Sequence, residues 1–189
     1  RVFMLDRHTH PRFSIGESST PVADIVIADL AKRYALPQLA SLSMYGRWKQ
    51  ELPHLVCGKK RGFSYFKHRK GECYGHSCGK DSLLVAASAC DAESDTHWLR
   101  SDVDTYLFRQ SCDAGVHAME NCHVNQIVRE NNGWRVSWRH TGTDQYQNDC
   151  ARIIIDATGH GGLMGDKLGL SRLDKTLSTT TSALYGHFR

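Results

Sequence analysis

Residues 2–7 read Val2-Phe3-Met4-Leu5-Asp6-Arg7, a short apolar run that ends in a carboxylate. Four apolar residues in succession have the length of a buried β-strand. The segment that follows, 8–21, is polar and contains proline and glycine, which predicts an ordered loop. The chain therefore opens with a strand that delivers an acidic side chain to the start of a loop.

The carboxylate of Asp6 has two interpretations. At the end of the second strand of a Rossmann-like α/β unit, a carboxylate binds the ribose of a dinucleotide through its 2′-hydroxyl. An aspartate after a strand is also a common cap or turn residue. The glycine-rich turn that precedes such a carboxylate by about 20 residues would lie before Arg1. We therefore expect the chain to be an interior fragment, 1–189, of a longer protein.

Further along the chain, helical and extended patterns follow one another. Apolar spacing predicts helices over 23–34, 37–42 and 103–112, the last one capped by Ser101 or Asp102 and closed by Gly115. Alternating or β-branched runs predict strands over 62–67, 83–87, 116–119, 122–129, 134–138 and 152–155. This order predicts an α/β fold with an antiparallel insert rather than an all-α or all-β chain.

The composition excludes several classes of protein. The 189 residues are 40% hydrophobic and 23% charged, which is ordinary globular composition. No apolar run reaches the roughly 18 residues of a membrane-spanning helix. The net charge of +4 arises from 24 basic and 20 acidic residues interspersed along the chain, so nothing indicates a nucleic-acid partner.

The seven cysteines are irregularly spaced, which argues against a secreted disulfide framework and favours free thiols in the cytoplasm. One cluster, His68, Cys73, His76 and Cys78, contains ligands that suit zinc. No second pair follows at zinc-finger spacing, so we expect no metal. A non-catalytic metal-binding module is the alternative from a different functional class.

Three further segments suit a bound ligand, and each also has a purely structural interpretation. The loop Phe13–Pro21 contains Gly16, where the backbone can approach a flat ligand closely. Arg100 comes just before a predicted helix, where it could hold an anion or pair with Asp104. The turn Asp156-Ala157-Thr158-Gly159 suits close packing against a nucleotide, or is a simple structural turn.

Two adjacent lysines precede the predicted strand 62–67. Successive side chains of a strand point to opposite faces, so only one of Lys59 and Lys60 can face inwards if the extended geometry reaches back that far. A basic run such as Lys59-Lys60-Arg61 is otherwise typical of a solvated face.

Taken together in this order, the segments resemble the flavin-dependent halogenases, the tryptophan-halogenase-like branch of the FAD-dependent oxidoreductases. The resemblance runs from Arg1 to about Gly169. The matching motifs are Leu5-Asp6-Arg7, Ile15-Gly16-Glu17-Ser18-x-Thr20-Pro21, Lys60-Arg61-Gly62-Phe63-Ser64-Tyr65, Arg100-x-x-Val103-Asp104-x-x-Leu107 and Asp156-Ala157-Thr158-Gly159.

The resemblance implies a partial FAD-binding Rossmann-like domain with part of an antiparallel substrate-side sheet, the latter inserted at 57–98. It implies that Lys60 is the family's lysine, which guides or carries hypohalous acid generated at the flavin. The residues it assigns to FAD are Asp6 on the ribose, Arg7 near the cofactor, Ile15, Gly16, Glu17 and Ser18 in a strap between flavin and substrate, Arg100 beside the flavin, and Asp156 and Gly159 in a later FAD-contacting turn.

The activity that the resemblance implies is halogenation of an electron-rich small molecule by an enzyme that uses reduced flavin, oxygen and halide. A separate flavin reductase would supply the reduced cofactor. The alternative in the same superfamily is a flavin monooxygenase or prenyl-chain reductase, in which Lys60 is incidental. The Trp-x-Trp-x-Ile-Pro signature that separates halogenases from monooxygenases does not occur in the 189 residues, so both interpretations stay open.

Overall fold

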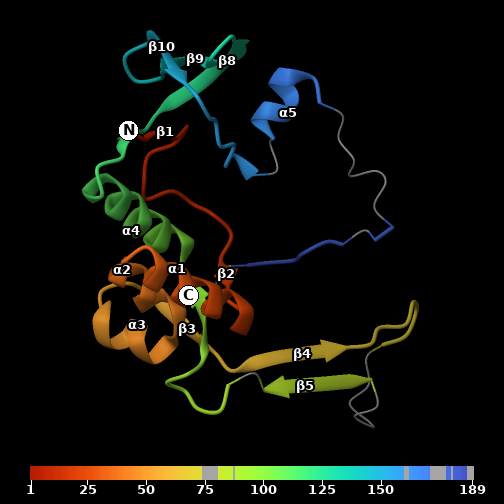
Figure 1. The fold of residues 1–189 in the computed structure, drawn as a ribbon. Helices are drawn as coiled ribbons and strands as arrows, with labels where there is room; N and C mark the ends of the chain where they lie inside the picture. Colours follow the sequence, from red (N-terminus) through yellow and green to blue (C-terminus); the bar gives the residue numbers. More distant parts are fainter. Residues whose placement is uncertain (74–80, 87, 160–161, 171–177, 180, 187–189) are drawn as a thin grey trace. The chain divides into compact units, whose positions relative to one another are not determined.

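Helices and strands follow one another along the chain in the computed structural model, which describes residues 1–73, 81–86, 88–159, 162–170, 178–179 and 181–186 (Figure 1). The α/β class predicted from the sequence is therefore confirmed. The chain divides into two units, which we call the lysine unit (13–106) and the aspartate unit (1–12 with 107–189).

The first helix of the lysine unit is α1 (Pro21–Arg33), which begins two residues before the predicted start. Thr20 is its N-cap, and its hydroxyl accepts a hydrogen bond of 3.3 Å from the backbone N–H of Ala23. Pro21 occupies the first helical turn, where its missing N–H costs nothing. Three short elements follow: α2 (Pro37–Ala40), the 3₁₀ helix η1 (Ser41–Ser43) and α3 (Tyr45–Glu51).

The core of the lysine unit forms around Trp48, which is fully buried together with Leu42 and Val103. The indole Nε1 of Trp48 donates a 2.9 Å hydrogen bond to the carbonyl of Leu55, so its one polar atom is satisfied. The ring lies 6.1 Å from that of Trp98 in a tilted arrangement. This packing fixes α3 beneath the strand that carries Trp98.

A three-stranded antiparallel sheet lies beside this core, in the order β2 (Glu17–Ser18), β6 (Asp95–Trp98), β3 (Cys57–Lys60). The central strand β6 pairs with β2 on one side and with β3 on the other. None of the three was predicted as a strand. They are two to four residues long and rich in polar side chains, so they have no local hydrophobic pattern that predicts a strand. Hydrogen bonding to neighbouring strands defines them instead.

The strands predicted at 62–67 and 83–87 form the hairpin β4 (Gly62–Phe66) and β5 (Ser82–Ala86). Gly62 faces Ala86 across this ladder. A Cβ at position 62 would collide with the backbone oxygen of Val85, so the close approach of the two strands requires a glycine there.

Helix α4 (Arg100–Asp113) belongs to the lysine unit as far as Tyr106 and to the aspartate unit from Leu107. The predicted cap is wrong, because α4 begins at Arg100 and both Ser101 and Asp102 lie in its first turn. Gly115 does close the helix, with φ of +88° and an N–H that donates to the carbonyl of Cys112.

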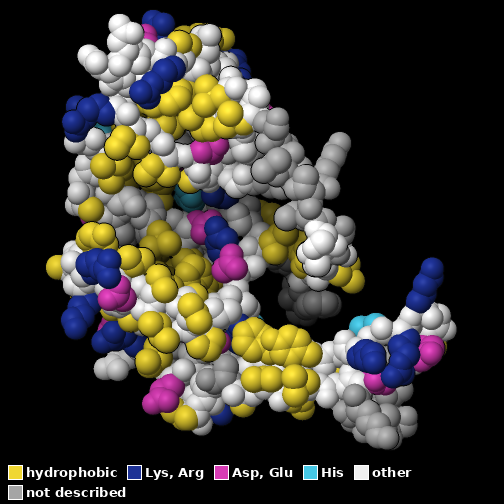
Figure 2. All heavy atoms as spheres, turned by 45° about the vertical axis from the view of Figure 1, so that its right-hand side comes forward, with side chains coloured by type: hydrophobic (Ala, Val, Ile, Leu, Met, Phe, Trp, Pro, Cys, Tyr) yellow, Lys and Arg dark blue, Asp and Glu magenta, His cyan; other side chains and the backbone are white. Residues whose placement is uncertain are grey.

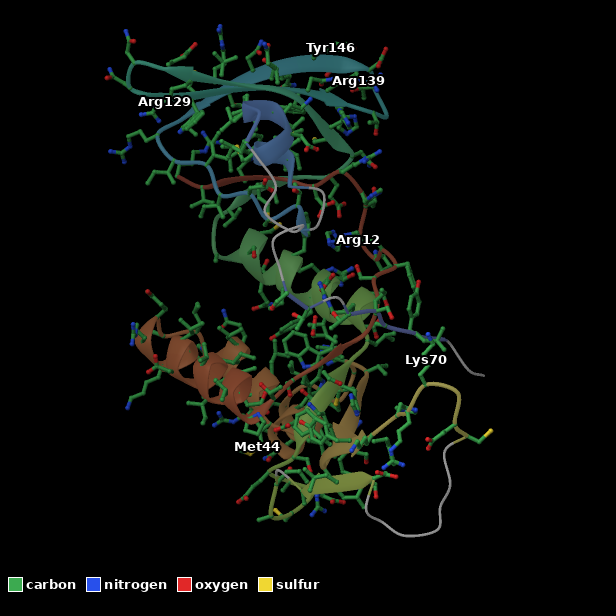
Figure 3. All side chains as sticks on the ribbon, turned by 90° about the vertical axis from the view of Figure 1, so that its right-hand side faces the viewer. Arg12, Met44, Lys70, Arg129, Arg139 and Tyr146 are labelled. Carbon is green, nitrogen blue, oxygen red and sulfur yellow. The ribbon has the colours of Figure 1, made fainter. Side chains whose placement is uncertain are left out.

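In the aspartate unit, β1 (Phe3–Leu5) pairs in parallel with β7 (His117–Met119). A second sheet is antiparallel in the order β10 (Gln145–Ala151), β9 (Gly133–His140), β8 (Cys122–Glu130). Figure 3 shows Arg129, Arg139 and Tyr146 on this sheet. Ile127 of β8 and Trp138 of β9 are buried, and the Trp138 indole donates to Asp149 at 2.7 Å. A short helix, α5 (Leu163–Leu168), follows.

The predicted buried strand at 152–155 is wrong. The strand ends at Ala151, and Ile153 and Ile155 are 79% and 85% exposed. The β-branched run has the composition of a strand, but none of the described residues pairs with it. The true strand, 145–151, was missed because its side chains are mostly polar and exposed.

Candidate functional site

The two adjacent lysines of β3 lie in opposite environments. The side chain of Lys60 is 6% exposed, whereas that of Lys59 is 38% exposed and pairs with Asp91 at 2.5 Å. Arg61 binds the same surface carboxylate at 2.6 Å. The alternation along the strand therefore turns Lys60 inwards, as expected if the extended geometry reaches back from Gly62.

Lys60 is held by three different groups. Its Nζ donates a hydrogen bond to the backbone oxygen of Ser19, just before α1. The same nitrogen lies 3.8 Å from the Oδ2 atom of Asp95 and 4.0 Å from the centroid of the Phe63 ring. Asp95 is its partner across the ladder of β3 and β6. A backbone carbonyl, a carboxylate and an aromatic face thus surround one ammonium group.

Two carboxylates belong to this cluster. Asp95 is 4% exposed, and its Oδ2 accepts no hydrogen bond from any described residue; the same holds for Oδ1 of Asp24 in the first turn of α1. Burial raises the pKa of Asp24 from its ordinary 3.8 to about 6. A hydrogen bond with Ser19 opposes this rise, while the negative charge of Asp95 adds to it.

Ser19 and Thr96 fix the geometry of the cluster. The Ser19 hydroxyl accepts a 2.8 Å hydrogen bond from the Thr96 N–H, and the Ser19 N–H donates to the Thr96 carbonyl. The Trp98 indole donates to the Thr96 hydroxyl at 2.8 Å. Because these groups are buried and satisfied, the Ser19 carbonyl that binds Lys60 has a defined position.

The expected strap, residues 15–18, includes strand β2. Glu17 and Ser18 pair with Trp98 and His97, and the Ser18 hydroxyl lies 2.5 Å from Nδ1 of His97. Burial lowers the pKa of His97, and the charge of Lys60 lowers it further while Asp95 opposes both. The contact of His97 with Ser18 carried no sequence signal, because the two residues are 79 positions apart in the chain.

Ile15 and Gly16 present open surface at the start of the strap. Ile15 is about half exposed. A Cβ at Gly16 would meet only the Trp98 carbonyl, at an ordinary 3.5 Å. The packing of the described chain does not require a glycine at this position, so the space above the backbone remains open to a flat ligand.

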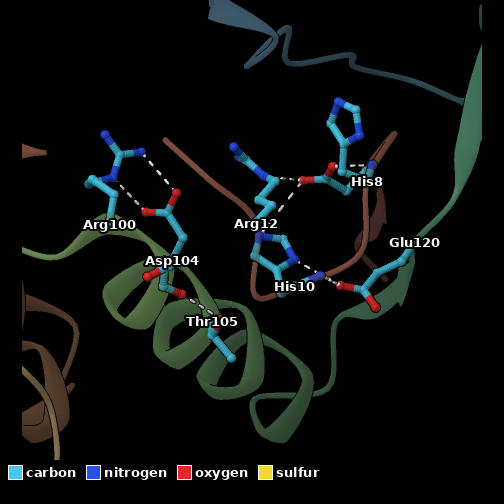
Figure 4. Close-up of polar contacts among 9 residues, drawn as sticks. His8, His10, Arg12, Arg100, Asp104, Thr105 and Glu120 are labelled. Atoms are coloured by element: carbon cyan, nitrogen blue, oxygen red, sulfur yellow. Dashed lines mark hydrogen bonds and ion pairs between the residues drawn. The ribbon is translucent and has the colours of Figure 1, made fainter. Parts of the chain in front are cut away.

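Arg100 uses its guanidinium within the protein. Its Nε and Nη2 donate to the two oxygens of Asp104 at 2.6 and 3.1 Å, a pairing drawn in Figure 4. Its Nη1 donates to Glu17 at 3.3 Å. These carboxylates, the Asp104 hydrogen bond above all, raise the pKa of Arg100. Of the two sequence interpretations, the geometry favours pairing with Asp104 over capture of an anion.

In the aspartate unit, Asp6 lies directly after β1 and its Oδ1 accepts a 2.8 Å hydrogen bond from the His8 N–H. Its Oδ2 lies 3.7 Å from Nε of Arg12 and 4.0 Å from Nε2 of His10 (Figure 4). His10 is anchored in turn by Glu120, which accepts from its backbone N–H at 2.7 Å and contacts its ring Nδ1 at 2.8 Å. Sequence reasoning did not identify His10 or Glu120.

The turn after residue 155 is organised by Asp156. Its carboxylate accepts hydrogen bonds from the N–H and hydroxyl of Thr158 and from the Met164 N–H, at 2.6 to 2.9 Å. These bonds, that of the Thr158 hydroxyl most of all, lower the pKa of Asp156. Gly159 has φ of +72°, which favours glycine.

The predicted residues fall into two groups. The lysine unit holds Lys60, Ile15, Gly16, Glu17, Ser18 and Arg100, and within it Glu17 contacts Arg100 directly. The aspartate unit holds Asp6, Arg7, Asp156 and Gly159. Arg7 is exposed. The sequence pattern left open which lysine faces inwards, the resemblance selected Lys60, and the structure buries the side chain of Lys60. Sequence reasoning missed the two carboxylates around it.

Two exclusions apply to the part of the chain that the structure describes. It contains no group of three or more metal-ligating side chains. Two of the four residues of the candidate zinc cluster, His76 and Cys78, lie outside the described residues. Among the described helices, none combines the length and the apolar character needed to cross a membrane.

Comparison with known proteins first defines the class. The fold is shared with flavoproteins: a flavoprotein/dehydrogenase from Cytophaga hutchinsonii superposes over 91% of the chain and 37% of its own, with a TM-score of 0.63 and 19% identity. A more specific likeness is to FAD-dependent halogenases. The solved halogenase PltM, in complex with phloroglucinol and FAD, matches 89% of the chain with a TM-score of 0.74 and 27% identity.

Curated sequences give the same answer. The chain is 25% identical to monodechloroaminopyrrolnitrin halogenase PrnC of Pseudomonas fluorescens and 26% identical to tetracycline 7-halogenase of Kitasatospora aureofaciens, in each case over 99% of its length. No family model matches it. The resemblance to flavin-dependent halogenases is confirmed. The chain spans about a third of the length of these relatives: 31% of PrnC, 32% of tetracycline 7-halogenase and 31% of PltM.

Proposed function

We propose that the whole protein is a FAD-dependent halogenase that acts on an electron-rich aromatic small molecule. The observation that carries the proposal is the buried position of Lys60, the residue that the sequence resemblance matches to the halogenase lysine, in a chain similar to halogenases along its length. A merely solvated basic run would leave both lysines of β3 exposed.

The residues of the chain fit FAD in their chemistry. Asp6 supplies a carboxylate after a parallel strand, suited to ribose hydroxyls. The strap offers an exposed Ile15 and an unfilled position at Gly16, suited to the face of a flat ring. Bound FAD, reduced and exposed to oxygen and halide, supplies the hypohalous acid. The remaining roles proposed toward FAD belong to Arg7, Glu17, Ser18, Arg100, Asp156 and Gly159.

The overall reaction balances as follows. One reduced flavin, one oxygen molecule, one halide, one proton and one aromatic C–H give oxidised flavin, the aryl halide and two water molecules. Flavin and aromatic carbon are oxidised, and oxygen is reduced. The chain's own contribution is to hold Lys60 where hypohalous acid passes, so that the halogen reaches the organic substrate instead of water.

The insert 57–98 is proposed to form the substrate side. Its hairpin exposes Tyr65 and Leu83, which face one another across the ladder, and also Phe66 and Leu84, which lie on the opposite face. Figure 2 shows hydrophobic side chains gathered in the lower part of the view. Apolar and aromatic surface of this kind suits an organic substrate.

Two further properties are inferred. A separate flavin reductase supplies reduced FAD, since the reaction consumes one reduced flavin in each cycle. The protein works in the cytoplasm, a placement supported by the unpaired thiols of Cys57, Cys73, Cys90, Cys112, Cys122 and Cys150.

The proposal is tested with the whole protein, FAD, an added flavin reductase, NADH, oxygen and phloroglucinol as probe, in chloride or bromide. We expect aryl halide, recognised by its isotope pattern in mass spectrometry, and its mass should follow the halide supplied. A hydroxylated product that forms equally well without halide would replace the proposal with the monooxygenase interpretation.

A further inference from the structure

The site around Lys60 contains more negative charge than one lysine needs. Asp95 lies opposite Lys60 on β6, and Asp24 approaches from α1. Both carboxylates contain a buried oxygen without a hydrogen-bond donor among the described residues. Lys60 and Asp95 also act on His97, a further titratable side chain of β6. The surface carboxylate Asp91 is already occupied by Lys59 and Arg61.

A buried cluster of charged side chains contributes little to the stability of the fold. Taking charges out of water costs several kcal/mol per ion, and buried pairs replaced by packed apolar residues are often neutral or more stable. Stability therefore does not explain why a lysine and two carboxylates are buried together. The contact between Nζ and the Phe63 ring supplies a reason, because Phe63 is the second residue of β4 and Tyr65, two positions further along the same strand, is exposed.

We propose that Asp95 is a positioning residue for Lys60. Its carboxylate holds the Lys60 ammonium over the Phe63 ring as a charged hydrogen-bond donor, and Asp24 is a second carboxylate beside Asp95. The inference rests on the proposed function. Asp24, whose pKa is raised by burial and by Asp95, gives the pair a site for one extra proton. Below about pH 6 the Asp24 carboxyl carries a proton, which removes one negative charge from beside Asp95.

A charged donor suits one form of halogen transfer. The aromatic carbon forms a bond to the halogen of hypohalous acid as the halogen–oxygen bond breaks. The leaving hydroxide takes a proton from the Lys60 ammonium and becomes water. The proton lost from the ring then restores the ammonium. Asp95 touches none of the reacting atoms and acts by fixing the place and charge of Nζ.

The first test needs no substrate. The FAD-loaded whole protein is labelled with trace acetic anhydride, and modification of Lys60 and Lys59 is quantified by mass spectrometry at about pH 7 and about pH 10. Because only the uncharged amine reacts, Asp95→Asn should raise Lys60 labelling at least about fivefold near pH 7 and much less near pH 10. Labelling of Lys59 should not change, and Asp95→Glu should restore slow labelling of Lys60.

The matched control is Asp91→Asn, which removes the surface carboxylate and should leave Lys60 labelling unchanged. An equal rise at both pH values in Asp95→Asn would mean that the variant merely loosens the site, and it would overturn the proposal. Unchanged labelling of Lys60 would overturn it too.

The second test measures aryl halide formed per reduced flavin consumed, with phloroglucinol as probe. Asp95→Asn should lower this ratio at least about tenfold at an unchanged rate of flavin oxidation, and Asp95→Glu should recover part of it. An undiminished ratio in Asp95→Asn overturns the inference. If the wild type forms no halogenated product, the proposed function fails instead, and the labelling result alone decides whether Asp95 holds Lys60.

Discussion

Lys60 and Asp95 face one another across the β3–β6 ladder, with 3.8 Å between Nζ and Oδ2 and almost no solvent exposure of either side chain. Every charge removed from this pair leaves its partner buried and uncompensated. Substitutions in the site must therefore be designed so that loss of folding is not mistaken for loss of function.

Replacement of Lys60 by Met should abolish halogenated product, while reduced flavin is still consumed. Methionine keeps much of the side-chain volume and contact with Phe63 but cannot donate a hydrogen bond. Product and flavin oxidation are measured together, and retained FAD absorbance with a cooperative unfolding transition shows that the variant is folded.

The matched control is Lys59→Met, which disturbs only an exposed pair with Asp91 and should be nearly silent. Normal product yield in folded Lys60→Met would remove Lys60 from the reaction.

Asp24→Asn should stabilise the whole protein at neutral pH. In the folded protein the pKa of Asp24 is raised from its ordinary 3.8 to about 6. Protonation of Asp24 therefore adds to the free energy of unfolding. This contribution is complete below the ordinary pKa of 3.8 and is lost as the pH rises through about 6. The shift corresponds to at most about 3 kcal/mol, and we expect about 1 kcal/mol because the group is only half-buried and lies in a helix first turn, where its negative charge helps.

The measurement is the melting temperature of wild type and Asp24→Asn at several pH values. The two should converge near pH 4 and separate above pH 6. A variant that is less stable than wild type at neutral pH would contradict the penalty assigned to the ionised Asp24. Asp29→Asn, an exposed residue of the same helix, is the control.

Asp6→Ala should weaken FAD binding at least tenfold, since a charge-assisted hydrogen bond contributes about 1.5–3 kcal/mol. Asp6→Asn should retain the hydrogen bond from the His8 N–H but lose the charge near Arg12. Its FAD affinity should therefore lie between those of the wild type and Asp6→Ala. Dissociation constants come from flavin fluorescence. An FAD affinity unchanged in Asp6→Ala would refute the assignment of Asp6 to the ribose.

Gly62→Ala should destabilise the protein by about 1–3 kcal/mol, because the new Cβ meets the backbone of β5 and not a movable side chain. Gly165→Ala has open space and lies inside a helix, so it should be neutral or stabilising by up to about 1 kcal/mol. Denaturant unfolding compares the two. Equal effects would show that the hairpin accommodates a side chain at position 62.

Local sequence patterns were sufficient to predict an element where it is long or where a capping, turn or glycine residue marks its end. The helix after Thr20, the hairpin from Gly62 and the close of α4 at Gly115 were all predicted with small errors. The turn between β8 and β9, Asn131-Asn132-Gly133, likewise consists of residues typical of a tight hairpin turn. In each case the signal lies within a few residues of the feature.

The candidate site was less accessible, because its contacts join segments distant in the sequence. Lys60 meets Ser19 from 41 residues away. Asp95 and Asp24 had no local pattern to distinguish them from surface carboxylates. The resemblance directed attention to Lys60, but only pairing of β3 with β6 identified Asp95 as its partner.

Because β6 is the central strand of its small sheet, it fixes the register of both neighbouring strands. β6 binds Ser18 through His97 on one edge and Lys60 through Asp95 on the other. A one-residue slip of either edge strand would turn its side chains to the opposite face. Strap and lysine therefore share one register: an insertion within β6 would shift the partner of Ser18 and the partner of Lys60 together.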